Sequence, residues 1–244
     1  GYYATNKEIK KVKVLSIGGG SYEVEGYDVL ADAKVYPHNS FTEIKQYCKD
    51  NNLTLVDYVK KFDPNGWKFL PTVLKALEDS VKAGIDGEGP FNGPIKMNKL
   101  TKKILDNLKK RNFPKDSIDY VMAYGYSVAE INVQHGIVVT APTLGSAGVI
   151  PAVLYYCKHN LGYSDEMLIE MLAVAGVIGI LFKKHGSIAG ATGGCQAECG
   201  SACSMAAAGY VWSKKGSIEE IEAAAIIAIE HHLGLTCDPV LGYV

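Results

Sequence analysis

The sequence of 244 residues contains a single arginine, Arg111, among 25 basic residues. Because a planar guanidinium is the usual bidentate partner of a carboxylate, an acidic ligand would have to be held by backbone N–H groups, hydroxyls, lysines or a metal. The formal net charge is -1, and the one basic stretch, residues 96–110, is expected to be the solvated face of a helix. This charge pattern excludes the concentrated basic surface of a nucleic-acid-binding protein.

Long apolar runs and common cofactor motifs are also lacking. The longest apolar run, residues 171–182, is too short for a membrane span, which needs about 20 residues, so we expect a buried core helix. Gly18 to Gly20 lack the GxGxxG spacing of a dinucleotide-binding loop. The six cysteines come without a secretory signal pattern, which predicts a reducing compartment, the cytoplasm. Clustered thiols there bind metal or react more often than they form disulfides.

Helical periodicity is the dominant pattern in the chain. Apolar residues make up 48% of the sequence, which is enough for a sizeable core. The pattern predicts a mainly α fold, with capping boxes at Ser40–Glu43 and Thr54–Asp57 and a further cap at Ser217–Glu220. Helices are expected at residues 40–50, 54–62, 71–84, 98–111, 117–133, from 149 with Pro151 in the first turn, 164–184, 195–213 and 217–232. Residues 137–143 are expected to be a short extended run.

Residues 11–30 have a different pattern from the rest of the chain. The alternation of Val12, Val14 and Ile17, followed by three glycines, predicts a short β-hairpin. Because a lone hairpin cannot bury a core, we expect it to trail from an α/β domain that the chain does not contain. This divides the sequence into a strand segment, residues 1–36, and a helical catalytic domain, residues 37–244, which we expect to be incomplete at its C-terminal end.

Three cysteines recur every four residues, at Cys195, Cys199 and Cys203, and would lie along one face of a helix. Cys195 also stands at the expected helix start, where the helix dipole favours the thiolate that binds metal. Cys237 follows the next helix, and a helical hairpin could return it to Cys195. Sulfur ligands favour zinc, copper(I) or an iron–sulfur cluster. Packing thiols are the alternative: we favour it for Cys199 and Cys203 and leave it open for the other two.

Two glycine-rich loops, residues 143–148 and 186–194, each lead into a predicted helix. Free N–H groups and the positive end of a helix dipole suit a carboxylate or phosphate there. The alternative is that the glycines only end helices and permit close packing. Side chains that could join a site at these loops are Thr143, Ser146, Ser187 and Thr192.

Four further polar residues border the loops. His185 adjoins the second loop and His135 precedes the extended run, so either could face a pocket and transfer a proton. Glu130 and Asn132 stand just before the same run. For this last pair, an ordinary polar helix end is an equally open interpretation.

Three ordered segments carry a resemblance to a known family: VTAPTLGSAGVIPAVL (139–154), GCQAECGSACSMAAA (194–208) and GLTCDPV (234–240). They strongly resemble the bacterial iron–sulfur L-serine dehydratases, and a weaker likeness covers nearly the whole chain. The resemblance implies the catalytic alpha domain of an L-serine ammonia-lyase, which converts L-serine to pyruvate and ammonia. It also implies an oxygen-sensitive 4Fe-4S cluster held by three cysteines, of which Cys195 and Cys237 match two.

The resemblance implies further parts outside this chain. The third cysteine is expected beyond Val244, and an N-terminal beta domain with a serine- and histidine-containing substrate loop is expected before residue 1. We also expect a homodimer. Two positions depart from the family pattern: His185 stands where asparagine is common, and Thr192 where some relatives have an acidic or small residue. These departures affect the expected placement of the substrate.

The resemblance also leads to a mechanistic hypothesis. Elimination from serine must remove a weakly acidic Cα proton and expel hydroxide, and an open iron would act as a Lewis acid on the hydroxyl and carboxylate. The base is left open between His135 and His185. Residues expected to contact the substrate are Glu130, Asn132, Thr143, Gly145, Ser146 and Ser187.

Three rival functions stay open. The first is a related cluster-dependent L-cysteine desulfidase. The second is a pyridoxal-phosphate serine dehydratase, which would need Lys183 or Lys184 as its Schiff-base lysine. The third is a non-catalytic zinc-binding module, which the lack of paired CxxC motifs disfavours.

Overall fold

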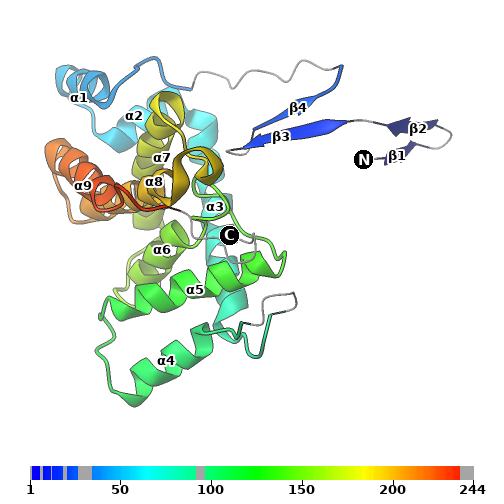
Figure 1. Ribbon diagram of the computed structural model, residues 1–244. Helices are drawn as coiled ribbons and strands as arrows, with labels where there is room; N and C mark the ends of the chain where they lie inside the picture. The colour runs from blue at the N-terminus through cyan, green and yellow to red at the C-terminus, as the bar shows by residue number, and fades with distance from the viewer. Residues whose placement is uncertain are drawn as a thin grey trace.

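The structure is a computed structural model that describes residues 2–5, 8–11, 13–18, 21–26, 35–91 and 97–236. Within these ranges it contains nine helices and two small antiparallel strand pairs (Figure 1), which confirms the predicted mainly α class. None of the described helices combines the length and apolar character that crossing a membrane requires.

The helices occur close to the predicted positions. Their bounds are α1 Phe41–Asp50, α2 Leu55–Phe62, α3 Pro64–Ile85, α4 Thr101–Lys110, α5 Asp119–Val133, α6 Val149–His159, α7 Asp165–His185, α8 Gly190–Ser213 and α9 Ile218–Glu230. Pro151 lies in the first turn of α6, as expected, where a missing N–H costs no helical hydrogen bond.

The predicted start of α3 at residue 71 is wrong, because the helix begins at Pro64. Asp63 caps this earlier start: its side chain accepts a hydrogen bond of 2.8 Å from the N–H of Gly66. Pro71 therefore lies inside the helix. Proline usually marks a helix start because it lacks an N–H group, and here the Asp63 cap with proline directly after it is the stronger signal.

Side-chain caps define the starts of two helices as predicted. At α2, the N–H of Asp57 donates to the Thr54 hydroxyl at 3.1 Å, and the N–H of Thr54 donates back to the Asp57 carboxylate at 3.1 Å. The same reciprocal pair joins Ser217 and Glu220 at the start of α9. Each box satisfies two N–H groups that a helix start would otherwise leave unpaired.

The predicted capping box at α1 forms only in part. The Ser40 hydroxyl accepts the N–H of Glu43 at 3.2 Å. The Glu43 carboxylate, however, accepts the N–H of Asn39 at 2.6 Å, one residue earlier than a capping box requires. The helix start is therefore satisfied by the two residues before it.

The core is built around α7, which packs against α2, α3, α6 and α8 (Figure 1). Many of its apolar side chains are buried, including Leu168, Met171, Val174 and Val177. The apolar run at residues 171–182 is therefore a core helix, as predicted. On one side of it, α8 also packs against α6 and α9, while α5 packs against α3, α4 and α6.

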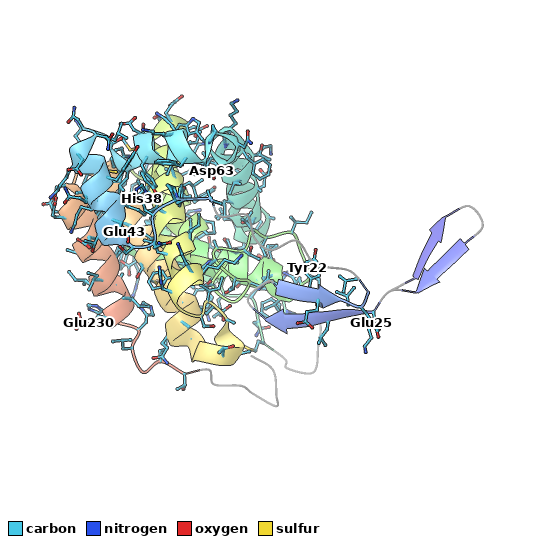
Figure 2. The ribbon with its side chains drawn as sticks, turned by 90° about the horizontal axis from the view of Figure 1, so that it is seen from above. Tyr22, Glu25, His38, Glu43, Asp63 and Glu230 are labelled. Atoms are coloured by element: carbon cyan, nitrogen blue, oxygen red, sulfur yellow. The ribbon has the colours of Figure 1, made fainter. Side chains whose placement is uncertain are left out.

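Two hairpins lie to one side of the helices (Figures 1 and 2). The predicted hairpin is confirmed: β3, Val14–Gly18, pairs antiparallel with β4, Ser21–Val24. A second pair, β1 at Tyr2–Thr5 with β2 at Glu8–Lys11, was not predicted. Tyr22 and Glu25, labelled in Figure 2, mark the β3–β4 hairpin, where Val14, Leu15 and Tyr22 leave more than half of their surface exposed. Residues 137–143 pair with no strand among the described ranges.

Candidate active site

A backbone kink divides α8 into a first turn and a long segment. Gly194 has φ 70° and ψ −172°, a conformation that favours glycine. Residues 190–193 form the first turn, and the long segment begins at Cys195, which is half-buried. The predicted helix start at residue 195 is therefore the start of the long segment, and the turn before it was not predicted. The kink gives Cys195 the helix-start position that the sequence indicated.

The segment after α9 returns to this point. The N–H of Gln196 donates to the carbonyl of Leu235 at 2.9 Å, and the N–H of Gly234 donates to the Gln196 side-chain oxygen at 2.9 Å. Cys237 itself lies outside the described residues, which end at Thr236 in this region. The chain that leads to Cys237 is thus hydrogen-bonded to the residue that follows Cys195.

Three other described cysteines, Cys48, Cys157 and Cys203, have the character of packing residues. Cys48 and Cys157 are buried, and burial raises the pKa of each thiol to about 11. Burial also raises the pKa of Cys203 to about 11, with a smaller contribution from Cys199. A thiol with such a pKa stays protonated at neutral pH when no metal is bound. Within the described ranges, no three His, Cys, Asp or Glu side chains converge in a metal-binding arrangement.

The first glycine-rich loop binds a carboxylate from the chain itself. Glu198 lies on α8, three residues after Cys195. Its Oε1 accepts a hydrogen bond from the Thr143 hydroxyl and a second, of 3.0 Å, from the N–H of Gly145. Ser146 is buried beside them, with its hydroxyl 3.3 Å from that of Thr143. The predicted groups of the first loop therefore lie together, and Glu198 accepts hydrogen bonds from two of them, Thr143 and Gly145.

The second glycine-rich loop meets the same carboxylate. A Cβ atom added at Gly190 would lie 2.5 Å from Oε2 of Glu198, and one added at Gly145 would lie 2.6 Å from it. These separations are too short for any side chain, so both positions need glycine while Glu198 stays in place. The structure thus brings the two glycine-rich loops together around Glu198.

A cavity of about 720 Å³ opens beside this contact, between α7, α8 and the two loops. Its lining contains one acidic side chain, Glu198, and one basic side chain, Lys183. Most of the other lining groups are apolar or small. They include Leu144, Ile180, Ile188 and Gly190.

The two candidate histidines lie on the surface. His185 ends α7, and its Nε2–H donates to the carbonyl of Asn39. His135 follows α5 with φ 60° and is exposed. Neither is among the residues that line the cavity, so the structure does not place either predicted base next to Glu198.

Two other predicted residues support the loops. Asn132 donates to the carbonyl of Leu144 at 3.2 Å and so holds the first loop against α5. The Ser187 hydroxyl accepts the N–H of Ala189 at 3.2 Å, just before the first turn of α8. Both contacts are internal to the protein, and any contact of these side chains with substrate stays a prediction.

Glu130 occupies a different place from the loop residues. Its side chain is buried, and Oε1 accepts the N–H groups of Leu100 and Thr101, the latter at 3.0 Å. It therefore caps the start of α4, where a negative charge is favoured by the helix dipole. Oε2 has no hydrogen-bond partner in the described part of the chain. Its hydrogen bonds in the described part of the chain go to Leu100 and Thr101 and not to the 143–148 loop, so the structure does not bring it together with Thr143.

Sequence reasoning missed Glu198. Its two donors stand 55 and 53 residues earlier in the chain, so no local pattern joins them. One signal was present: a carboxylate three residues after Cys195 shares its face of the helix.

Comparisons with known proteins agree with this geometry. Residues 42–244 match the family model described as serine dehydratase alpha chain. The chain is 37% identical to L-serine dehydratase 1 of Escherichia coli K12, over 94% of this chain and 54% of that protein. It is 38% identical to the L-serine dehydratase of Haemophilus influenzae, over 97% and 55%. It is 35% identical to the L-serine dehydratase of Streptomyces coelicolor, over 100% and 56%.

The chain therefore spans about half the length of the curated relatives that it matches. The matched range contains both glycine-rich loops, the kinked start of α8 and Glu198. The resemblance drawn from the three sequence segments is confirmed, and the chain belongs to the serine dehydratase alpha-chain family.

Proposed function

We propose that this chain forms the alpha part of an enzyme that converts L-serine to pyruvate and ammonia. The observation that carries the proposal is the meeting of both glycine-rich loops at Glu198, one helical turn from Cys195 and beside a cavity of about 720 Å³. Family membership and the names of the relatives support serine as the substrate.

We further propose that Cys195 and Cys237 are two of three thiolate ligands of a 4Fe-4S cluster. The donor set fits such a group, because thiolates are the usual ligands of iron–sulfur clusters. Half-buried Cys195 stands at a helix start. The hydrogen bond from the N–H of Gln196 to the carbonyl of Leu235 holds the segment that leads to Cys237 near Cys195. The third cysteine is expected beyond Val244. When bound, a cluster with one open iron supplies a Lewis acid for the serine hydroxyl and carboxylate.

The chain's own residues would shape the substrate site and exclude water from it. Leu144, Ile180 and Ile188 line the cavity and would exclude water from the reacting groups. We propose that the substrate receives polar contacts, either directly or through Glu198, from Thr143, Gly145, Ser146 and Ser187. Asn132 would hold the 143–148 loop in place. Glu130 would contribute to substrate binding from its position at the start of α4.

The proton of serine Cα must pass to a base during the elimination. His135 and His185 remain the proposed candidates on this chain, and each would have to reach the cavity from the surface. The resulting enamine tautomerises to an imine, whose hydrolysis gives pyruvate and ammonia. Closure of the site by a further domain would bring other groups to the same proton.

We propose that the strand segment, residues 1–36, belongs to the missing beta domain. The extra length of the relatives supports a further domain, and Val14, Leu15 and Tyr22 leave more than half of their surface exposed on the hairpin. We therefore propose a domain boundary at residue 37. The homodimer and the cytoplasmic location stay predictions.

Anaerobic purification of the complete protein tests the proposal. We expect iron and acid-labile sulfide in equal amounts, near four of each per chain, with pyruvate formed from L-serine faster than from L-cysteine.

Faster reaction with L-cysteine would establish the desulfidase instead. A pyridoxal aldimine band without iron would establish the pyridoxal-phosphate rival, for which Lys183 is better placed than Lys184, since Lys184 contacts Asn39. Protein that contains zinc but no iron and forms no pyruvate would support the non-catalytic zinc-binding module.

A further inference from the structure

We propose that Glu198 binds the α-ammonium group of the amino-acid substrate. The inference rests on the proposed function and assigns a substrate-binding role to a side chain that the loops hold in place. It also separates two tasks: the 143–145 segment fixes Glu198, and Glu198 recognises the substrate.

One oxygen of the carboxylate is committed to the protein. Oε1 accepts both the Thr143 hydroxyl and the Gly145 N–H. These two donors come from a segment that is itself fixed, because Thr143 is buried and Asn132 holds the carbonyl of Leu144. The position of the carboxylate is therefore set before any substrate arrives.

The other oxygen faces a ligand site. Oε2 makes no hydrogen bond within the described ranges and lies between Gly145 and Gly190. Glu198 and Gly190 both line the cavity, and the Glu198 side chain is only half-buried. The absence of side chains at the two glycines lets Oε2 pack against both loops, so a ligand group would reach Oε2 from the cavity that Glu198 lines.

Charge determines which substrate group fits. Among the described residues that line the cavity, Glu198 is the single carboxylate, and a carboxylate attracts an ammonium group and repels a second carboxylate. The N–H of Gly145 and the hydroxyl of Thr143 are already used by Glu198, so they are not free to receive the substrate carboxylate. An amino acid would therefore present its ammonium group to Glu198 and its carboxylate elsewhere.

The position on α8 agrees with this orientation. Residues three apart in a helix share a face, with Cβ atoms roughly 5–6 Å apart. Cys195 and Glu198 have this spacing. A serine held by its ammonium group at Glu198 thus lies about one turn from the proposed cluster ligand.

Two analogues of serine, each lacking one group, separate ammonium binding from simple support of the loop. L-Alanine lacks the hydroxyl, and 3-hydroxypropionate lacks the amino group. Their dissociation constants are measured by calorimetry on the complete, cluster-loaded protein and its E198Q variant. We expect E198Q to raise the dissociation constant of L-alanine at least tenfold. The dissociation constant of 3-hydroxypropionate should stay within twofold of the wild-type value, because the glutamine oxygen still accepts both loop hydrogen bonds.

A second variant keeps the test decisive if E198Q fails to fold or to load its cluster. In G190A the new Cβ would lie 2.5 Å from Oε2, so the carboxylate must move while its charge remains. The same selective loss of L-alanine binding is expected. Equal losses for both analogues would assign Glu198 to loop support alone, and no loss for either would remove it from the site.

Two results separate this inference from the proposed function. Wild-type protein that forms pyruvate from L-serine but binds 3-hydroxypropionate and not L-alanine would overturn the ammonium assignment alone. Wild-type protein that forms no pyruvate would overturn the proposed function itself, and with it the inference.

Discussion

The N–H of Gly145 donates a hydrogen bond of 3.0 Å to the carboxylate of Glu198, across 53 residues of sequence. This bond joins the loop that leads into α6 to the helix that carries Cys195. The same carboxylate lies against Gly190, so one side chain connects both glycine-rich loops. Changes at its partners should therefore alter the site more than they alter the fold.

Thr143→Val tests the hydroxyl that donates to Glu198. Valine has nearly the same shape, but it removes one of the two donors to Oε1. We expect the unfolding free energy to fall by about 1 kcal/mol and pyruvate formation from L-serine to fall roughly tenfold, since 1.4 kcal/mol of lost substrate orientation has that effect. Thr143→Ser keeps the donor and should retain most of the activity. Wild-type kinetics in the valine variant would show that this hydrogen bond does not matter.

Gly145→Ala tests the close approach at the loop. The added methyl would lie 2.6 Å from the Glu198 carboxylate, and a flexible side-chain end moves more easily than a backbone. We expect activity to fall by more than tenfold while the melting temperature changes by only a few degrees. Gly125→Ala is the control on α5, because a Cβ there makes only ordinary contacts, at 3.8 and 3.9 Å, and Gly125 does not line the cavity. This control should raise the unfolding free energy by about 0.5–1 kcal/mol.

How far the sequence could predict this molecule depends on the range of the interactions involved. The capping box of Thr54 and Asp57 spans three residues, and the apolar run of α7 is continuous, so both were predicted correctly. The start of α3 was missed because the Asp63 cap competes with Pro71 as a signal. Glu198 was missed because its donors are far away in sequence. For His185, proximity to a loop in sequence did not mean proximity in space, because its ring turns to Asn39.

Glu78 on α3 should make stability depend on pH in the acid range. Burial opposes its ionisation, but hydrogen bonds from Lys82, Lys158 and His159 outweigh burial and lower its pKa from 4.5 to about 2. A lowered folded-state pKa stabilises the protein above the unfolded value, and this contribution is lost as pH falls from about 4.5 to about 2. These contacts join α3 to the end of α6.

Glu78→Gln removes this charge with little change of shape. We expect it to lower the unfolding free energy by about 3 kcal/mol at pH 7, from a shift of this size at 1.36 kcal/mol per unit. The difference from wild type should shrink between pH 4.5 and pH 2. Lys75→Gln is a control, because its partner Asp79 is exposed and such pairs contribute little. Denaturant titration over this pH range measures both, and a pH-independent difference would refute the assignment.

Iron and sulfide counts in cysteine variants of the complete protein test the central claim most directly. Cys195→Ala and Cys237→Ala should each lose the cluster absorbance and pyruvate formation together, while the helical circular dichroism signal stays. Cys203→Ala should keep both, because the raised pKa of that thiol, about 11, marks a packing residue. Full iron content and full activity in either of the first two variants would contradict the account.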